Sequence, residues 1–402
     1  MTEFVGRMLL IWVPAAMVAH AEDWPRWLGT EGTGRTTETE WRPEVDSIRW
    51  QTEIGVGFSS AAVVGDRVVV SGYVAEAEVI WCLSAEDGSV LWSLRYAAPL
   101  LPNLHEGGPA STALIVAGKV YALGKAGHLH CLGLEEGNVL WSVNLREMSG
   151  LRTPPQWGYA GSPILVDDKL IVESSETWAL DPEDGSVIWK SEPYKPAYGT
   201  PAPLRLGAKT FLATLKTDGL VILDAADGRS KALTVWRTSF QTNANTPIVV
   251  GDQLFLSTGY GRGCGLFRFT GGELVPLYEG KTMSNHMNNS ILVDGYLYGF
   301  DGTAHRGAPA EMTCIEWATG ETQWRQGGLG CGSLLEGNGH LVILTETGDL
   351  VFAKTSPDGY EEVSRTSILS GRCWTMPTFA NGVVYARNAA GRMVGVTLKS
   401  GL

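Results

Sequence analysis

One short phrase returns along this chain and constrains its fold more than any other feature. LSAEDGSVLW (Leu83–Trp92) is followed by LGLEEGNVLW (Leu132–Trp141) and by LDPEDGSVIW (Leu180–Trp189). In each phrase an acidic residue and a glycine predict a tight turn between antiparallel strands, because glycine adopts a positive φ without steric cost. The Trp four residues after that glycine lies on the strand that follows the turn. The chain is therefore expected to repeat one hairpin-containing unit.

The aromatic residue at the end of each phrase sets a regular spacing. Its positions along the chain, 42 to 49 residues apart, are Trp50, Trp92, Trp141, Trp189, Trp236, Tyr278 and Trp324. A period in the forties, with four short alternating strands in each unit, predicts a β-propeller blade. A helical repeat would instead place apolar residues at positions i, i+3 and i+4, which these segments do not. We expect each Trp to pack between neighbouring blades.

The two ends of the chain complete each other. The last unit, TFANGVVYARNAAGRMVGVTLKSGL, stops where its fourth strand should begin, and the missing strand is present near the N-terminus as IRWQTEI around Trp50. If Trp50 pairs with the Met393–Leu398 segment, a ring of eight units closes without an unpaired edge. We therefore predict an all-β fold, an eight-bladed β-propeller of four-stranded antiparallel blades in one domain, residues 48–402, with residues 22–47 packed on it.

The N-terminal sequence is typical of a secretory signal peptide. Arg7 precedes an apolar run from Met8 to Val18, and Ala19-His20-Ala21 matches a small-residue cleavage site. Eleven apolar residues are too few to cross a bilayer, so residues 1–21 predict export to the periplasm or cell envelope, not membrane insertion. The net charge of −12 and the pI near 5.1 disfavour nucleic acid as a partner, because phosphate binding needs clustered Lys and Arg.

Beyond the repeat, several longer stretches resemble a known family. Together with the phrase Leu-x-x-x-x-Gly-x-x-x-Trp, these are DWPRWLG from Asp23, WGYAGSP, NHMNNSILVDGYLYGFDG and GRCWTMPTFANGVVYARN. They resemble PQQ-binding-like β-propeller repeat proteins, in the superfamily of quinoprotein alcohol dehydrogenase-like propellers and the outer-membrane assembly propeller lipoprotein. The resemblance covers nearly the whole mature chain and implies the propeller fold. In the enzymes of that superfamily it also implies pyrroloquinoline quinone (PQQ) with calcium. The chain departs from those enzymes in having no Cys-Cys dipeptide and no CxxCH motif.

The loops that lead into the first strand of each unit are the candidate site. They repeat around the axis on one face and should converge on the central channel. Aromatic, amide and guanidinium groups are concentrated there, which suits a small planar, polar or anionic ligand, but the same groups also suit hydrogen bonding to one another and to channel water. The predicted ligand-binding residues are His105, Trp157, Tyr159, Tyr198, Asn243, Asn245, Arg262, His286, Asn288, Asn289, Arg372 and Trp374.

Catalytic and covalent features are sparse. Asp301 and His286 are the candidates for a general base, and Arg262 or Arg372 would hold quinone carboxylates if PQQ binds. The pattern predicts no metal site. Cys331 and Cys373 precede the inner strands of adjacent units, where equivalent positions come close, and are the candidate disulfide.

Three functions remain open at this stage. The lack of a catalytic motif favours an exported, non-catalytic binding or scaffolding module of the cell envelope, monomeric, with envelope proteins or peptides as partners. The alternatives are a PQQ-dependent oxidoreductase of alcohols or sugars and a propeller that binds a small ligand or carbohydrate.

Overall fold

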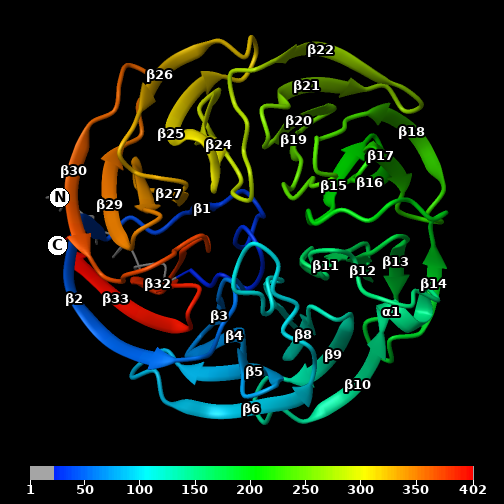
Figure 1. Cartoon of the computed structure of the whole chain (residues 1–402), viewed down its shortest axis with the longest axis horizontal. Helices are drawn as coiled ribbons and strands as arrows, with labels where there is room; N and C mark the ends of the chain where they lie inside the picture. Colours follow the sequence, from blue (N-terminus) through cyan, green and yellow to red (C-terminus); the bar gives the residue numbers. More distant parts are fainter. Residues whose placement is uncertain (1–21, 402) are drawn as a thin grey trace, which may run out of the picture.

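Strands grouped into eight sheets around a central axis make up the fold (Figure 1). The computed structural model describes residues 22–401, apart from the side chains of Arg306 and Ala308. The predicted signal peptide lies outside the described residues. Each blade has four antiparallel strands, which run in chain order from the axis outward in the first seven blades, and the all-β, eight-bladed propeller is confirmed.

The first four blades follow one another without interruption. Their strands, from the axis outward, are β3 (Ala62–Val64), β4 (Arg67–Val74), β5 (Ala77–Ser84) and β6 (Val90–Ala97); β7 (Leu114–Val116), β8 (Lys119–Leu123), β9 (His128–Gly133) and β10 (Val139–Asn144); β11 (Ile164–Val166), β12 (Lys169–Glu173), β13 (Thr177–Leu180) and β14 (Val187–Lys190); β15 (Ala202–Leu206), β16 (Lys209–Leu215), β17 (Gly219–Asp224) and β18 (Ser230–Val235).

The last four blades repeat this order, except that the eighth takes its outer strand from the N-terminal part of the chain. Their strands are β19 (Ile248–Val250), β20 (Gln253–Thr258), β21 (Gly263–Phe269) and β22 (Leu274–Gly280); β23 (Ile291–Val293), β24 (Tyr296–Thr303), β25 (Arg306–Glu316) and β26 (Thr322–Gln326); β27 (Ser333–Gly337), β28 (His340–Leu344), β29 (Asp349–Lys354) and β30 (Glu362–Ser367); β31 (Thr378–Ala380), β32 (Val383–Arg387), β33 (Arg392–Ser400) and β2 (Trp41–Glu53).

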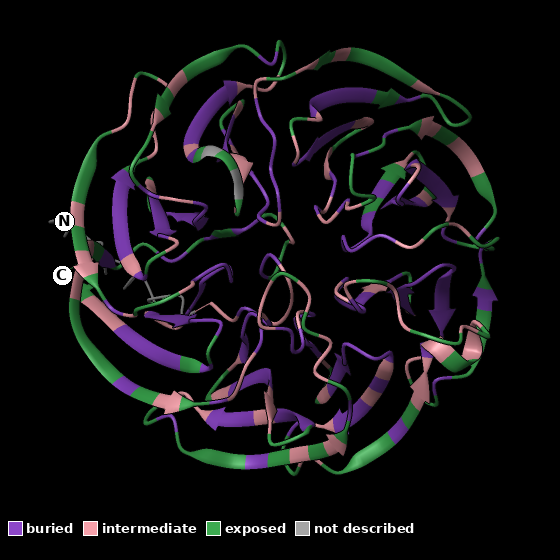
Figure 2. Cartoon of the chain, in the orientation of Figure 1, coloured by how far each residue is buried: buried purple, intermediate pink, exposed green. Residues whose placement is uncertain are grey.

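Burial follows position within the blade. The second and third strands are buried on both faces because a neighbouring blade covers each side, and their sequences are continuous apolar runs such as GLVILD in β17. The outer strands alternate between buried and exposed residues, as Figure 2 shows along the rim. The only helix of the described residues is the short α1 (Leu145–Met148), capped by the Asn144 side chain. No described helix has the length and apolar character needed to cross a lipid bilayer.

The repeated Trp joins each blade to the next. Trp92 Nε1 donates a hydrogen bond to Leu134 O across the blade boundary, at 2.7 Å. Its ring lies on Gly137 of the next blade's turn, where a Cβ would stand 2.5 Å from the ring and φ is +69°. The repeated Gly is therefore required both for the turn and for contact with the preceding blade's Trp. The same donation to the next blade is made by Trp50, Trp141, Trp189, Tyr278 and Trp324.

The fourth blade departs from the predicted Trp series. By register, Ala232 opposite Ile222 holds the position that Trp141 opposite Cys131 holds in the second blade. Trp236 follows β18 and donates to Thr258 Oγ1 at 2.9 Å instead. The assignment of Trp236 to the series was therefore wrong. The spacing of four residues after the turn glycine would have identified Ala232.

The predicted closure of the ring is confirmed. In β2, Trp50 pairs with Gly395 of β33, and Thr52 pairs with Met393. The strand begins at Trp41, before the expected boundary at residue 48, so it includes part of the segment that was expected to pack on the propeller. Register shifts accommodate the added length on both sides of Val45.

Residues 22–40 cross the axis before they reach β2. Trp24 forms an antiparallel bridge with Val63 of the first blade, and Pro25 O accepts from Ile115 N of the second at 2.8 Å. Trp27 Nε1 donates to Thr246 Oγ1 beside the fifth blade at 3.0 Å. The segment then adds β1 (Arg35–Thr36) parallel to β27, so the seventh sheet has five strands. Figure 1 shows this deep-blue stretch near the centre of the ring.

The cysteines do not form the predicted disulfide. All six are buried free thiols, including Cys331 and Cys373. The Cys373 thiol is directed to Gly371 O at 3.7 Å. Burial raises the pKa of both Cys331 and Cys373 to about 12, so neither is a reactive thiolate at neutral pH. They act as small buried residues beside the inner strands.

Removing one of the Trp side chains that join blades should cost far more than removing a rim side chain on the same strand. We expect Trp141→Ala to lower the free energy of unfolding by about 3–5 kcal/mol, because a cavity opens between the second and third blades. Val139→Ala, at a half-exposed position of β10, should change it by about 0.5 kcal/mol or less. Urea unfolding measures both. Equal losses would contradict this role for the Trp.

Candidate functional site

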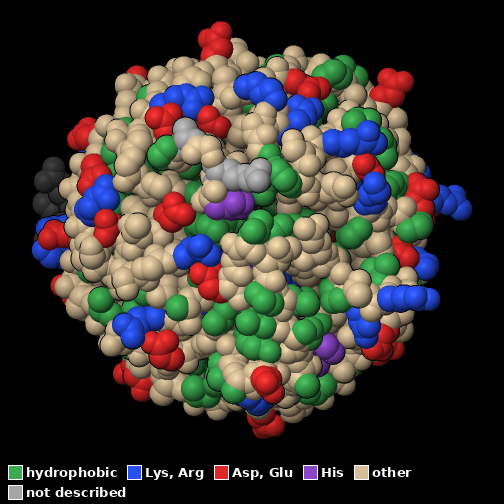
Figure 3. Space-filling view, in the orientation of Figure 1, with side chains coloured by type: hydrophobic (Ala, Val, Ile, Leu, Met, Phe, Trp, Pro, Cys, Tyr) green, Lys and Arg blue, Asp and Glu red, His purple; other side chains and the backbone are tan. Residues whose placement is uncertain are grey.

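A cavity of about 170 Å³ lies on the axis, where the loops that enter the inner strands converge. Every blade except the seventh contributes described residues to its lining. Figure 3 shows hydrophobic side chains gathered near the centre of one face, whereas charged side chains of both signs lie mostly toward the rim. We call this cavity the axial pocket. Its lining consists of Trp27, Phe58, Ser60, Leu104, His105, Ala110, Lys125, Trp157, Ala160, Ser162, Tyr198, Thr200, Thr242, Ala244, Thr246, Tyr260, His286, Met287, His305, Trp374, Thr375 and Met376.

Aromatic rings form much of the wall. The rings of His105 and Trp157 are stacked with centroids 5.5 Å apart, and those of Phe58 and Trp374 with centroids 6.0 Å apart. Trp374 is held in place by its Nε1, which donates to Glu346 Oε1 at 2.8 Å. These rings come from four different loops, so their arrangement depends on the closed ring. Flat faces of this kind favour planar ligands.

Two of the lining histidines are neutral at neutral pH. His286 Nδ1 accepts from Ala304 N at 3.3 Å, so its Nε2–H donates to the Tyr260 hydroxyl at 3.0 Å. His105 Nδ1 accepts from Gly107 N at 3.0 Å. Burial, with a smaller contribution from neighbouring basic groups, lowers the pKa of each to about 4. Neither imidazole therefore adds positive charge to the pocket.

Lys125 is the cation of the lining. It follows β8, is 1% exposed, and its backbone N–H donates to the Glu78 carboxylate at 3.0 Å. Among the described residues its Nζ has neither a hydrogen-bond acceptor nor an ion-pair partner. Burial lowers the pKa of this amine to about 8, opposed by the charge of Glu78. No described carboxylate lines the same pocket.

The loop between β6 and β7, residues 98–113, lies over the mouth of the axial pocket. Arg372 Nη1 pairs with Glu106 Oε2 at 2.6 Å and so ties this loop to the loop that enters the eighth blade. Phe58 N donates to Pro109 O at 2.7 Å and adds a tie to the first blade. The Arg372 guanidinium lies over the Trp374 ring at 4.3 Å. Arg372 therefore lies next to the axial pocket, and its charge is paired with that of Glu106.

The structure divides the predicted ligand-binding residues into two groups. His105, Trp157, Tyr198, His286 and Trp374 line the axial pocket, with Arg372 at its mouth. The others are not part of this lining. Most of them bond to protein groups, whereas the Asn288 side chain is buried without a hydrogen-bond partner among the described residues. Tyr159 is buried in the core, Asn243 donates to Trp236 O and Lys216 O, Asn245 to Asn288 O, and Asn289 pairs with the backbone of Thr246. Arg262 pairs with Glu279 and lies over the Trp236 ring.

Asp301 lies apart from the axial pocket. One of its oxygens accepts from Ser284 N at 2.8 Å and the other pairs with Arg325 at 2.5 Å. It belongs to a shallow surface depression beside β24. Both carboxylate oxygens of Asp301 are thus engaged by protein groups. The general-base role of Asp301 stays a prediction.

Sequence reasoning missed several lining residues. Phe58, Met287 and Met376 lie in the loops that were identified, but apolar residues there carried no chemical signal. Lys125 and Tyr260 lie in loops between second and third strands, GKAG and GYGR, from which only Arg262 was predicted. Trp27 belongs to the segment that was expected to pack on the propeller. A check of every loop that reaches the axis, including those between second and third strands, would have identified Lys125.

The lining does not fit PQQ with calcium. Calcium takes six to eight oxygen ligands, usually including carboxylates, and none lines the axial pocket among the described residues. Nor do those residues include a group of three or more His, Cys, Asp or Glu placed to hold a metal ion. The carboxylates of PQQ would meet one unpaired cation, Lys125. We derive no chemistry through this cofactor.

Comparison with known proteins agrees with the architecture. The model of the family described as outer membrane protein assembly factor BamB matches residues 30–153 and 118–326. A search of curated proteins finds no match. Among solved structures, BamB from Moraxella catarrhalis is 17% identical with a TM-score of 0.60, covering 87% of this chain and 100% of that one.

Two dehydrogenase structures are also similar, with lower sequence identity and higher TM-scores. Quinohemoprotein alcohol dehydrogenase from Comamonas testosteroni is 12% identical with a TM-score of 0.68, covering 94% of this chain and 81% of that one. A europium-containing methanol dehydrogenase is 11% identical with a TM-score of 0.69, covering 94% and 90%. At these identities the likeness concerns the fold alone.

Proposed function

Because the chain belongs to the family described as outer membrane protein assembly factor BamB, we propose that it is an exported, non-catalytic binding module of the cell envelope. The observation that supports binding most directly is the axial pocket. Seven blades contribute to it, many of its walls are aromatic, and it contains the Lys125 amine, which has no partner among the described residues. Pockets of this composition bind small molecules by stacking and by a few polar contacts. The ligand we propose is small and planar.

Thermal unfolding with planar probes tests this proposal. At 100 times its dissociation constant, a probe such as benzoate, benzamide or indole should stabilise the chain by about 2.7 kcal/mol. Ala160→Phe should abolish the shift because the new ring fills the pocket, whereas Ala208→Phe, on an exposed turn, should not. PQQ with calcium belongs in the same series, and we expect no dye reduction with alcohols or sugars. A probe shift that survives Ala160→Phe would contradict the site.

The surroundings of Glu22 support cleavage of the chain before this residue. Glu22 N donates to Glu38 Oε1 at 3.2 Å, and the same carboxylate accepts from Asn381 N at 2.6 Å and Gly382 N at 2.8 Å. Burial raises the pKa of Glu38, and the backbone donors oppose this effect. Cleavage after Ala21 would create an α-ammonium at this position, next to a carboxylate. The new N-terminus would thus gain an ion pair that links it to the eighth blade.

We expect the protein recovered from the envelope fraction to begin at Glu22, as mass spectrometry of the intact chain would show. In this processed chain, Glu38→Gln should lower the free energy of unfolding by about 1–3 kcal/mol, because backbone donors and the ammonium lose their acceptor. Glu40→Gln, at an exposed position nearby, is the control and should be neutral. A chain that retains residues 1–21, or equal effects of the two variants, would count against this proposal.

A second surface fits protein partners. The outer strands of the first three blades each expose an apolar pair directly before the Trp, namely Val90 and Leu91, Val139 and Leu140, and Val187 and Ile188. These pairs lie on edge strands, whose free backbone groups can pair with an added strand. We propose that envelope proteins or peptides bind along this rim.

Charge placed in the rim pairs should weaken partner capture. Leu91→Lys with Leu140→Lys should reduce the recovery of envelope proteins on the immobilised chain by about tenfold or more, because each lysine would be desolvated in the contact. Ser93→Lys with Ser142→Lys adds the same charge at exposed positions of the same strands and is the control. Quantitative mass spectrometry of the captured proteins measures the difference. Equal recovery by the two double variants would exclude the apolar pairs.

A further inference from the structure

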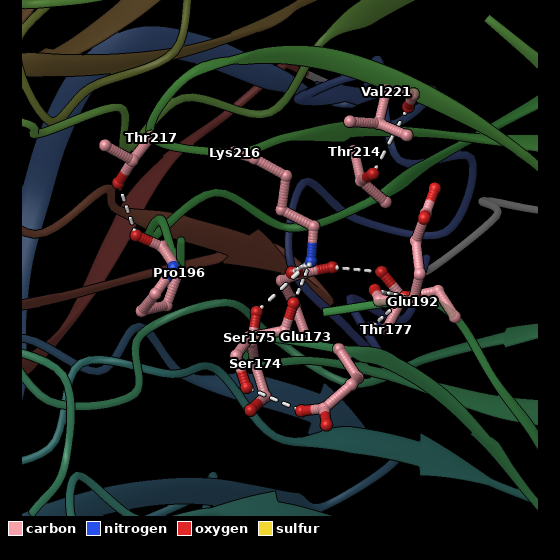
Figure 4. Close-up of polar contacts among 12 residues, drawn as sticks. Glu173, Ser174, Ser175, Thr177, Glu192, Pro196, Thr214, Lys216, Thr217 and Val221 are labelled. Atoms are coloured by element: carbon pink, nitrogen blue, oxygen red, sulfur yellow. Dashed lines mark hydrogen bonds and ion pairs between the residues drawn. The ribbon is translucent and has the colours of Figure 1, made fainter. Parts of the chain in front are cut away.

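The buried cations of the described residues are paired, with one exception. Lys216 Nζ forms an ion pair with the Glu173 carboxylate and donates to Ser174 O and Ser175 O at 3.2 and 3.3 Å, as Figure 4 shows. Arg387 donates to Ser71 O and Gly55 O, each at 2.7 Å. Such pairing is expected because an isolated buried charge is strongly unfavourable.

Lys125 is the exception, and it is as buried as Lys216. The nearest carboxylate, Glu78, already accepts from the Lys125 backbone N–H and from the Tyr96 hydroxyl, the latter at 2.6 Å. The lysine stem packs against Gly158, where a Cβ would stand 2.2 Å from Lys125 Cγ. The backbone thus leaves space for this side chain, and its amine reaches the axial pocket unpaired.

Trp157 stands next to this amine in the lining. Trp157 precedes Gly158, on which the Lys125 stem packs, and its ring is stacked with that of His105. Its Nε1 is fully buried and has no hydrogen-bond partner among the described residues, so this N–H is not open to a ligand in the pocket. The Lys125 ammonium is therefore the donor that an anionic group in the pocket would meet.

We propose that the axial pocket is selective for a planar aromatic monocarboxylate, whose carboxylate accepts from Lys125 while its ring lies against the aromatic walls. This inference rests on the proposed function of the pocket and specifies its ligand class. The charges of the lining favour a single carboxylate, because Lys125 is the only Lys or Arg among the described lining residues. His105 and His286 are neutral, Arg372 is paired with Glu106, and no described carboxylate lines the pocket, whose third histidine is His305.

Calorimetry with two isosteric probes tests the inference on the purified chain. Benzoate should bind at least about tenfold more tightly than benzamide, which has the same shape without the charge. Lys125→Met keeps the stem and removes the charge, and it should erase this preference while leaving benzamide affinity within about twofold. Lys399→Met removes a lysine from a surface ion pair with Glu44 and should change neither affinity.

The pH dependence gives an independent measurement. Burial lowers the pKa of Lys125 to about 8, and its titratable neighbours are Glu78 on β5, Tyr96 on β6, His105 and Tyr159. Benzoate affinity should be constant from pH 6 to about 7.5, then fall as the ammonium is lost, approaching about tenfold per pH unit above 8. Benzamide affinity should not change. A fall that persists in Lys125→Met would assign the titration to Glu78 and overturn the role of Lys125.

The outcomes separate this inference from the proposed function. If benzoate and benzamide bind equally and Ala160→Phe blocks both, the pocket is a ligand site but the monocarboxylate preference is wrong. If neither probe nor indole binds, the small-ligand function itself fails. If benzoate binding survives Ala160→Phe, the anion binds elsewhere on the chain, and the inference is overturned.

Discussion

The pairing of β2 with β33 is the constraint on which the rest of the structure depends. Each blade is covered on both faces only if it has two neighbours, so an open arc would expose the apolar faces of the first and eighth blades. The N-terminal strand supplies the outer strand of the eighth blade, and its Trp50 donates to Ala85 O of the first blade in the same manner as the other repeated Trp residues. Sheet pairing and Trp packing therefore close the ring together. The axial pocket exists only because this ring fixes its loops around one axis.

The repeat made the architecture predictable because each blade uses the same local chemistry. A glycine with positive φ, the Trp that lies on it and the short alternating strands are all visible in the sequence, and together they indicate the number of blades. The error at Trp236 is informative, because a count of aromatic residues alone cannot distinguish the position on β18 from the one just after it. With Ala232 at the repeated position of β18, the fourth blade has no Trp there. Trp236 follows the strand and packs against Phe267 of the fifth blade. Spacing from the turn glycine reports strand register, whereas residue type alone does not.

The site was predictable only to the level of its loops. His105, Trp157 and Trp374 were identified because they break the pattern of small residues in those loops, and they do line the pocket. The asparagines break the pattern equally, but they are not part of the lining, and Asn243, Asn245 and Asn289 bond to backbone groups of neighbouring blades. Sequence cannot distinguish these two uses, because both require a polar side chain near the axis. The disulfide expected from Cys331 and Cys373 failed for a related reason, since nearness to the axis does not orient two thiols toward each other.

The N-terminal segment links the stability of the ring to the shape of the pocket. The same stretch that completes the eighth blade first crosses the axis, where Trp27 joins the lining and bonds to Thr246 beside the fifth blade. A channel through eight blades would otherwise be open at both ends and filled with water, and an unpaired ammonium there would be solvated. Trp27 adds an indole ring to the lining, and apolar walls of this kind make the space less polar than an open channel. Burial lowers the pKa of Lys125 and would strengthen an ion pair formed there. The segment that completes the ring thus also contributes to the surroundings in which the proposed ligand would meet Lys125.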